Sequence, residues 1–461
     1  MKTHNRQRKA ALLLASLLLL AATPLPESVF AVTQTPKPTA EQYVLEQVIA
    51  GKPAQLAVQF PDEKDRVLSG LFLTNLLTNP AGKLQVHPHG IMIDGAIIAG
   101  ELDLINKEIP YDTILTNCHF QGVVNLTQSR FAKSLNLSNS IFEANADFES
   151  ATITFDLNVE HGGFASEVFF KSLHAGGDLL LNYADFKKAA DFSEVEVGGN
   201  MLSDHAKFYD TADFDNLKVK GDASFRDNEF HGRVSFDEAR FTNLFLTGCL
   251  FLSSTEHTDF TRMKMESGFL ENTRFNDRIK IDGISFQYLS PASWETLQTL
   301  ANHSEYNAEF YSSLEALFQR HGYPDQANKV FIAQKQRERR ERLHGLEWLW
   351  NFMQDLLVGY GRRLERLLLW SGVLVMVGCV VFRNEKGMKT INPEEQERCA
   401  GKYSAFWYSV DLFLPILTLG DKTTWAPRDD RRLAQLYRRI HIILGHLLVP
   451  IGLAAWAGII K

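Results

Sequence analysis

Large apolar residues recur through the middle of the chain at a spacing that neither a helix nor an ordinary hairpin produces. In the stretch TADFDNLKVKGDASF they fall at Phe214, Val219 and Phe225, five and then six residues apart, and a small or branched residue stands two places before each. Residues two apart on a strand point to the same face. Each unit therefore predicts a short strand with one small and one large inward side chain, followed by a corner.

The same spacing repeats every 22 residues in four rows of positions. Of the 28 positions, 26 are apolar, the exceptions being Ser203 and Thr247, whereas a hydrophobic content of 45% would give about 13 by chance. The rows are Ile98, Phe120, Phe142, Phe164, Phe186, Phe208, Phe230; Leu104, Leu126, Phe148, Phe170, Phe192, Phe214, Phe236; Ile109, Phe131, Ile153, Ala175, Val197, Val219, Phe241; and Leu115, Leu137, Val159, Leu181, Ser203, Phe225, Thr247. They predict a mainly β solenoid of eight or nine four-sided coils over 92–288, with coils about 4.8 Å apart.

Short motifs within this repeat carry a family resemblance. Ala146-Asp147-Phe148, Ala190-Asp191-Phe192 and Ala212-Asp213-Phe214 resemble the Ala-Asp/Asn-Leu/Phe unit of pentapeptide-repeat proteins. The resemblance covers less than half of the chain and implies that this part is a right-handed quadrilateral β-helix. The sequence departs from the family pattern because sides of five and of six alternate, so each coil is longer than four pentapeptide units.

Helical patterns flank the repeat on both sides. Apolar residues at helical spacing predict helices over 41–49 and 62–77, as a cap leading into a first coil near Ile91. After Ser290-Pro291 breaks the β pattern, helices are predicted over 294–300, 305–321 and 325–344. The expected organisation is a signal peptide (1–31), a helical N-terminal cap (32–90), the solenoid (91–289), a helical connector (290–345) and a membrane module (346–461).

The N-terminus has the pattern of a secretory signal. Basic residues precede an apolar run over 10–22, and Val29-Phe30-Ala31 supplies the small residues of a cleavage site. An uncleaved membrane anchor is the alternative interpretation, although the apolar run is short for a membrane span. Both interpretations predict that the solenoid is exported.

The C-terminal part predicts a membrane module. Spans are expected near 367–382 and 440–460, and Trp348 and Trp350 form an aromatic belt typical of a membrane interface. Between the spans, 403–420 could cross the bilayer, re-enter it or lie on its surface, because Asp411 and Pro415 are unusual in a lipid-facing helix.

The order of these segments is similar to two-span potassium-channel pore modules. Thr418, Gly420 and Asp421 correspond to parts of the channel filter Thr-Val-Gly-Tyr-Gly-Asp, but the Tyr-Gly pair is missing. A pore with these residues is therefore a secondary interpretation. His441 and His446 lie five residues apart, about 140° around a helix, so we expect no shared metal or haem between them.

The solenoid is acidic, with 17 Lys and Arg against 30 Asp and Glu over 98–290. This excess argues against nucleic-acid binding, which requires basic side chains to neutralise phosphates. Asp147, Asp191 and Asp213 share one column of the repeat. Two interpretations are open: a ladder that binds a cation or basic partner, or outward polar residues that keep the solenoid soluble.

No sequence motif indicates catalysis. The register over 98–247 leaves little loop length for converging catalytic groups, and no nucleophile-elbow, metalloprotease or phosphate-loop motif occurs. Cys118 and Cys249 occupy the same slot about six coils apart, or roughly 29 Å, too far for a disulfide. We expect no enzyme, no metal and no cofactor.

These features predict a membrane-anchored, non-enzymatic scaffold in the inner membrane, with several spans. Its expected partners are membrane lipid and a protein or glycan bound to the solenoid. The signal peptide places the solenoid on the periplasmic side, whereas eight Lys and Arg over 335–366 would favour the cytoplasm by the positive-inside rule. We follow the signal peptide, because charge bias weakens once a large domain is translocated. The alternative function is a channel-like protein with a solenoid sensor.

Overall fold

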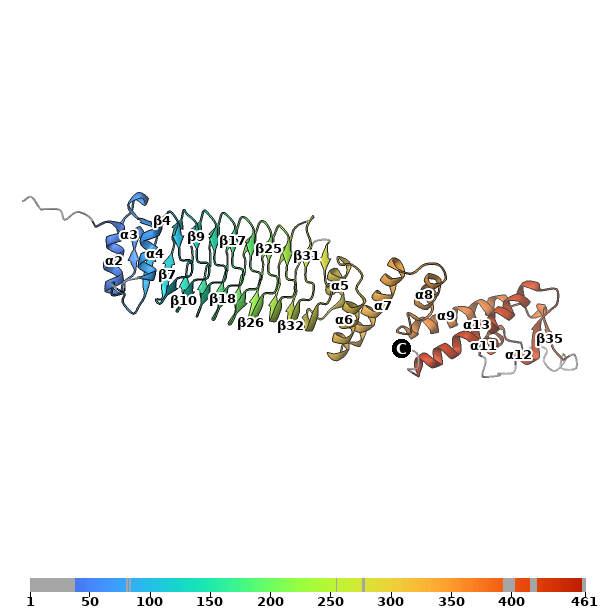
Figure 1. Ribbon diagram of the computed structural model, residues 1–461. Coiled ribbons are helices and arrows are strands. Elements are labelled where there is room, and N and C mark those ends of the chain that lie inside the picture. Colours follow the sequence, from blue (N-terminus) through green and yellow to red (C-terminus); the bar gives the residue numbers. More distant parts are fainter. Residues whose placement is uncertain are drawn as a thin grey trace, which may run out of the picture.

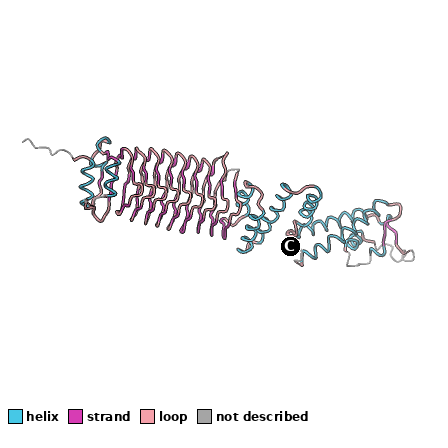
Figure 2. Tube along the Cα trace, in the orientation of Figure 1, coloured by secondary structure: helices cyan, strands magenta, loops and turns pink. Residues whose placement is uncertain are grey.

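The computed structural model describes residues 38–457, except 80–81, 83, 254, 276–277, 393–402 and 415–420. The predicted signal peptide, 1–31, lies outside the described residues. The molecule is elongated, with N-terminal helices, a long stack of strands, a helical connector and a C-terminal helical bundle following one another (Figure 1). Figure 2 shows that the strands are concentrated in the stack and that helices adjoin it at both ends.

The stack is the predicted β-solenoid, in which each strand pairs in parallel with its equivalent in the next coil, as Arg130 does with Thr152. One side is β2 (Val67–Ser69), β4 (Ile97–Ala99), β8 (His119–Phe120), β12 (Ile141–Phe142), β16 (Gly163–Phe164), β20 (Asp185–Phe186), β24 (Lys207–Phe208), β27 (Glu229–Phe230) and β30 (Leu250–Phe251). A second is β5 (Leu102–Asp103), β9 (Val124–Asn125), β13 (Ala146–Asp147), β17 (Val168–Phe169), β21 (Ala190–Asp191), β25 (Ala212–Asp213), β28 (Val234–Ser235), β31 (Thr258–Asp259) and β33 (Ile279–Lys280).

The other two sides belong to one 16-stranded sheet. One holds β6 (Glu108–Ile109), β10 (Arg130–Phe131), β14 (Thr152–Ile153), β18 (His174–Ala175) and β22 (Glu196–Val197). The other holds β1 (Ala54–Gln55), β3 (Ile91–Asp94), β7 (Thr113–Thr116), β11 (Leu135–Asn136), β15 (Leu157–Asn158), β19 (Leu179–Leu180) and β23 (Met201–Leu202). The longer strands β26 (Lys218–Ser224), β29 (Arg240–Phe245), β32 (Lys264–Phe269) and β34 (Ser285–Ser290) run around the corner and join the two sides.

The core is a set of side-chain ladders along the solenoid. Every position of the four predicted rows is buried except Thr247. Equivalent phenylalanines stack on one another from coil to coil, as Phe186 does on Phe208 at a centroid distance of 4.7 Å, and neighbouring columns meet edge to face. The polar exception, Ser203, is buried with Asn228, whose Nδ2 lies 3.4 Å from Ser203 Oγ. The fold class predicted from the sequence is confirmed.

Two kinds of corner explain the alternating spacing of five and six. In the five-residue step after Phe214, the chain makes a β-turn in which the N–H of Leu217 donates to the carbonyl of Phe214, and Asn216 has a φ of 57°. Such left-handed residues recur every 11 residues over most of the stack, at Asn106, Asn117, Gln128, Asn139, Ser150, His161, Ser172, Tyr183, Glu194, His205, Asn216, Asp227 and Glu238. The six-residue steps that follow Leu104 bend without one, so two compact and two wider corners close each of these coils.

The N-terminal cap is less helical than predicted. Helix α2 (Ala40–Ala50) matches the expectation, but only α3 (Leu56–Gln59), η2 (Glu63–Asp65) and α4 (Gly70–Thr78) follow it. The prediction of one helix over 62–77 was wrong, because Val67–Ser69 forms β2 and pairs with Ile97–Ala99. This strand, together with β1, gives the first complete coil a hydrogen-bonding partner and thereby covers its open edge.

The C-terminal end is closed by the predicted connector helices α5 (Trp294–Asn302), α6 (Ala308–Arg320) and α7 (Pro324–Glu341). Buried residues of α6, including Phe310 and Leu314, belong to the same hydrophobic cluster as the solenoid core. Beyond them lie α8 (Gly345–Val358), α9 (Leu364–Val381), η3 (Glu385–Gly387), β35 (Met388–Thr390), α11 (Ala405–Phe413), α12 (Asp421–Thr424), β36 (Trp425–Pro427) and α13 (Arg432–Trp456). Among the described residues, one helix is long and apolar enough to cross a membrane, over Arg432–Ala454 in α13.

Candidate functional site

The acidic column predicted on the solenoid lies on the side formed by β5 to β33. Asp147, Asp191 and Asp213 occupy equivalent positions in the register, but the column is not uniformly acidic. In order along the stack, it consists of Asp103, Asn125, Asp147, Phe169, Asp191, Asp213, Ser235, Asp259 and Lys280.

All six acidic and amide members of this column hold their own corner in place. In Asp213, Oδ1 accepts a hydrogen bond from the N–H of Asp215 at 2.9 Å, which is the geometry of an Asx turn. The same contact to the N–H two residues on is made by Asp103, Asn125, Asp147, Asp191 and Asp259. Because asparagine serves as well as aspartate, the turn requires an acceptor and not a charge. The column therefore forms turns, a structural role that neither interpretation of the sequence included.

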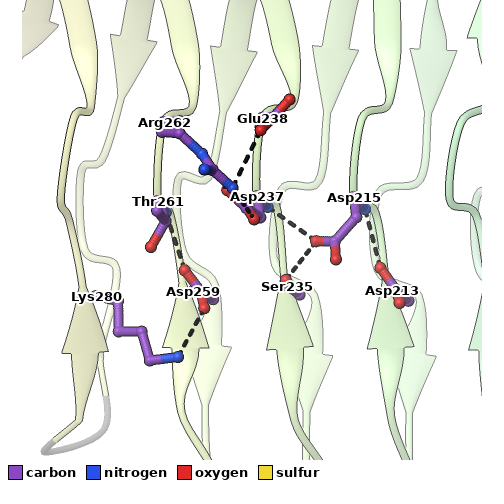
Figure 3. Close-up of polar contacts among 9 residues, drawn as sticks. All are labelled: Asp213, Asp215, Ser235, Asp237, Glu238, Asp259, Thr261, Arg262 and Lys280. Carbon is purple, nitrogen blue, oxygen red and sulfur yellow. Dashed lines mark hydrogen bonds and ion pairs between the residues drawn. The ribbon is translucent and has the colours of Figure 1, made fainter.

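Toward the C-terminal end, carboxylates that stand two or three residues after the column connect successive coils (Figure 3). Asp215 accepts hydrogen bonds from the Ser235 hydroxyl and from the N–H of Asp237 on the next coil. Arg262 Nη2 lies 2.8 Å from Asp237 Oδ2 and 3.1 Å from Glu238 Oε1. Asp237 and Glu238 are thus paired with Arg262, and Asp259 is paired with Lys280, which lowers the field available to an outside cation.

Two aspartates at equivalent positions have opposite pKa shifts. Burial raises the pKa of Asp213, and the charges of Asp215 and Asp191 raise it further. Burial also raises the pKa of Asp259, but hydrogen bonds from Thr261 and from Lys280, whose Nζ is 3.0 Å from Asp259 Oδ2, lower it overall. The pKa of Asp213 therefore reflects burial and the neighbouring carboxylates, whereas the pKa of Asp259 reflects the hydrogen-bond donors Thr261 and Lys280.

A second polar ladder on another corner was not predicted. In each step a side-chain oxygen accepts a hydrogen bond from a backbone N–H of the next coil. Asp156 Oδ1 accepts from the N–H of Asp178 at 2.8 Å, and Asp178 Oδ1 accepts from the N–H of Asn200 at 2.7 Å. Asn200 Oδ1 accepts from the N–H of Asp222 at 2.9 Å. Each side chain therefore binds the backbone of the next coil. The signal available in the sequence was the regular recurrence of Asp and Asn at these four positions, one in each coil.

Glycines make room for this ladder. A Cβ added to Gly199 would lie 2.2 Å from Asp178 Oδ1 and 2.9 Å from the carbonyl carbon of Gly177, and one added to Gly177 would lie 2.1 Å from Asp156 Oδ1. Because backbone as well as side-chain atoms are involved, these positions require glycine for close approach between coils. Within the described residues, no group of three or more His, Cys, Asp or Glu is arranged to hold a metal ion.

The solenoid cysteines take the place of small core residues, as predicted. Cys118 and Cys249 are buried and precede β8 and β30, which are six strands apart in one sheet. Their thiols donate to the carbonyls of Thr116 at 3.3 Å and of Phe225 at 2.7 Å. Burial raises the pKa of Cys118 to about 12 and raises that of Cys249 as well, so neither forms the reactive thiolate near neutral pH.

The candidate pore residues are only partly described. Thr418 and Gly420 lie outside the described residues, and Asp421 begins α12. The preceding helix, α11, packs between α9 and α13, where Ser409 donates to the carbonyl of Val375 at 2.9 Å.

The two histidines of α13 have separate environments. His441 is buried, with Nε2 3.0 Å from the carbonyl oxygen of Ser409, whereas His446 is exposed and its Nδ1 lies 2.8 Å from the carbonyl oxygen of Ile442. The two rings therefore have different hydrogen-bond partners and different exposure.

Comparison with known proteins identifies the repeat. A family model described as pentapeptide repeats (9 copies) matches residues 112–161 and 204–250, both within the solenoid. The solenoid, with its parallel four-sided coils, is therefore a pentapeptide-repeat β-helix, and solenoids of this kind are generally structural or interaction modules. Searches of curated proteins and of solved structures each found no match.

Proposed function

We propose that this chain is a non-enzymatic scaffold that holds a pentapeptide-repeat solenoid at a membrane and presents its sides to a protein or glycan partner. The observation that carries the proposal is a solenoid of about nine turns with a solid ladder core, closed at both ends by helices. Because closed ends prevent edge-to-edge assembly, the flat sides are the surfaces available for binding.

The C-terminal bundle supports a membrane anchor. The candidate span in α13 exposes Ile443 and Leu447, and α9 exposes Leu368 and Met376. Large apolar side chains on the outside of a bundle are typical of lipid contact. Under this proposal α9 is a second span and the solenoid faces the periplasm, as the N-terminal signal predicts.

Photo-crosslinking on the full-length chain in its native membrane tests the scaffold. A photoreactive residue is introduced at Lys188, Glu196 or Lys207, all exposed and at different places around one coil. We expect one side to give a discrete adduct of reproducible mass, while the same residue at Ser312, exposed on α6, gives none. Adducts from no position, or equally from all, would contradict a specific binding side.

A channel-like protein with a solenoid sensor is the second candidate function. The favouring observation is α11, a nine-residue helix packed against both α9 and α13 immediately before the segment that contains Thr418 and Gly420. A short helix between two spans is the arrangement of the pore modules that the sequence resembles. Single-channel recording from reconstituted protein tests it: conductance abolished in Gly420→Ala and Asp421→Asn supports a pore, whereas an electrically silent bilayer refutes it.

A further inference from the structure

Helix α8 is folded with its polar side inward and its apolar side outward. Its buried residues are Asn351 and Asp355, which are 6% and 8% exposed. The side chains turned to the outside are large and apolar: Leu346 (84% exposed), Trp350 (67%), Leu349 (49%), Trp348 (42%), Phe352 (37%) and Leu356 (36%). A surface helix of a globular protein has the opposite arrangement.

The inward side is fixed by a polar cluster that joins three helices. Asp355 Oδ2 accepts hydrogen bonds from Gln336 Nε2 at 2.9 Å and from Arg339 Nη2 at 3.2 Å, both on α7. Its Oδ1 lies 3.3 Å from Arg366 Nη1 on α9. Asn351 accepts from the Tyr360 hydroxyl at 2.7 Å. Since these contacts occupy the polar side of α8, the helix cannot turn its apolar side inward without breaking them.

The exposed apolar side of α8 continues onto the following helix. Trp370, on α9, donates from Nε1 to the carbonyl of Leu356 at 3.0 Å, so the two helices meet at this end of α8. Next to Trp370, Leu368 and Leu369 are 74% and 61% exposed. Figure 1 shows α8 between the connector helix α7 and the start of the bundle.

We propose that α8 lies in the interface of a phospholipid bilayer, with its Trp and Leu side chains among the upper acyl chains. The occupant is lipid because the apolar side leads directly into the outward face of the bundle, and because Trp is the residue type preferred at the headgroup boundary. The flanking segment 335–366 carries eight Lys and Arg against five Asp and Glu, which suits an anionic headgroup layer. This inference rests on the membrane anchor of the proposed function.

Spin labelling of the full-length protein in vesicles of phosphatidylcholine and phosphatidylglycerol tests the placement. Cys379 and Cys399 are first replaced by serine, while the buried Cys118 and Cys249 remain unlabelled. A nitroxide is then attached to Trp350→Cys, to Met376→Cys on the exposed face of α9, or to Ser312→Cys on α6. The measurement is the collision rate with oxygen relative to that with a water-soluble nickel complex.

We expect this ratio to be at least about threefold higher at position 350 than at position 312, and highest at position 376, because oxygen concentrates in the acyl region. A high ratio at 376 with a water-like ratio at 350 overturns the interfacial helix but leaves the anchor intact. Water-like ratios at both positions refute the anchor itself. Spin–spin broadening at position 350 would instead identify a second copy of the chain as the occupant and also overturn the proposal.

Discussion

At the scale of single residues, the local partners decide what a repeated side chain does. Asp213 and Asp259 have the same place in the coil and make the same turn. Of the two, Asp259 has a cation at the equivalent position of the next coil, because Lys280 follows it in the column whereas Ser235 follows Asp213. The repeat motif therefore predicts the turn but not the charge state.

Substituting each aspartate with asparagine should change stability in opposite directions. The raised pKa of Asp213 means that its charged form is disfavoured in the folded protein. The contribution of this group to the stability of the wild-type protein therefore falls as pH rises above the ordinary Asp pKa. Asp213→Asn keeps the turn acceptor and should therefore raise the unfolding midpoint at pH 7. Thermal unfolding at pH 7 and pH 3 measures the difference, which should vanish at pH 3.

Asp259→Asn is the matched control. Its lowered pKa means that the charged form is favoured in the fold, so this stabilisation is present above the ordinary Asp pKa and is lost as pH falls through the folded value. The variant should lower the midpoint at pH 7, with the difference shrinking toward pH 3. The same direction of change in both variants would contradict the role assigned to Lys280.

At the scale of the structural element, one coil is stable because the next one completes it. A two-residue strand such as β20 or β24 makes few hydrogen bonds, and the stacked phenylalanines connect it to the next coil. Contacts such as that of Asp178 with the N–H of Asn200 also join successive coils. Strands this short would not persist alone. Changes that separate two coils should therefore cost more than their local contacts suggest.

Gly199→Ala should push apart the two coils that are joined by Asp178 in the second polar ladder. The new Cβ would meet the backbone of Gly177 and the carboxylate that accepts the Asn200 N–H. We expect the free energy of unfolding to fall by about 2 kcal/mol or more, measured by denaturant titration followed by circular dichroism. Gly163→Ala is the control, since its Cβ would meet only Ile141 Cγ1 at 3.8 Å, and its effect should stay within about 1 kcal/mol.

At the scale of the whole molecule, Asp355 links the solenoid-side helices to the bundle. It pairs with Arg339 on α7 and with Arg366 on α9, and its side chain is 12% exposed. Removing one partner of a buried cluster leaves the other charges without compensation. The relative placement of the two halves therefore depends on this carboxylate.

Asp355→Ala should loosen α8 without unfolding the solenoid. We expect the α7–α8 contact to weaken by about 3 kcal/mol, and limited proteolysis near 340–362 to accelerate at least tenfold. Glu347→Ala, an exposed substitution on the same helix, should leave the cleavage rate unchanged. Unaltered proteolysis in Asp355→Ala would show that apolar contacts, and not the polar cluster, hold α8.

The period of the solenoid, its core rows and the placement of Cys118 and Cys249 could all be read from the amino-acid order. The sequence is sufficient for these features because inward positions in a parallel stack repeat in register, and burial selects apolar or small residues at each of them. The approximate positions of the connector helices followed in the same way from helical spacing.

Other features depended on contacts between residues far apart in the chain. Val67–Ser69 became a strand because the edge of β4 needed a partner, although the local pattern suggested a helix. The outward apolar side of α8 depends on Asp355 meeting Arg366, and the lowered pKa of Asp259 depends in part on Lys280, which the next coil supplies. Hydrophobic periodicity records which residues are buried, but hydrogen bonds and charges between elements depend on which elements meet in three dimensions.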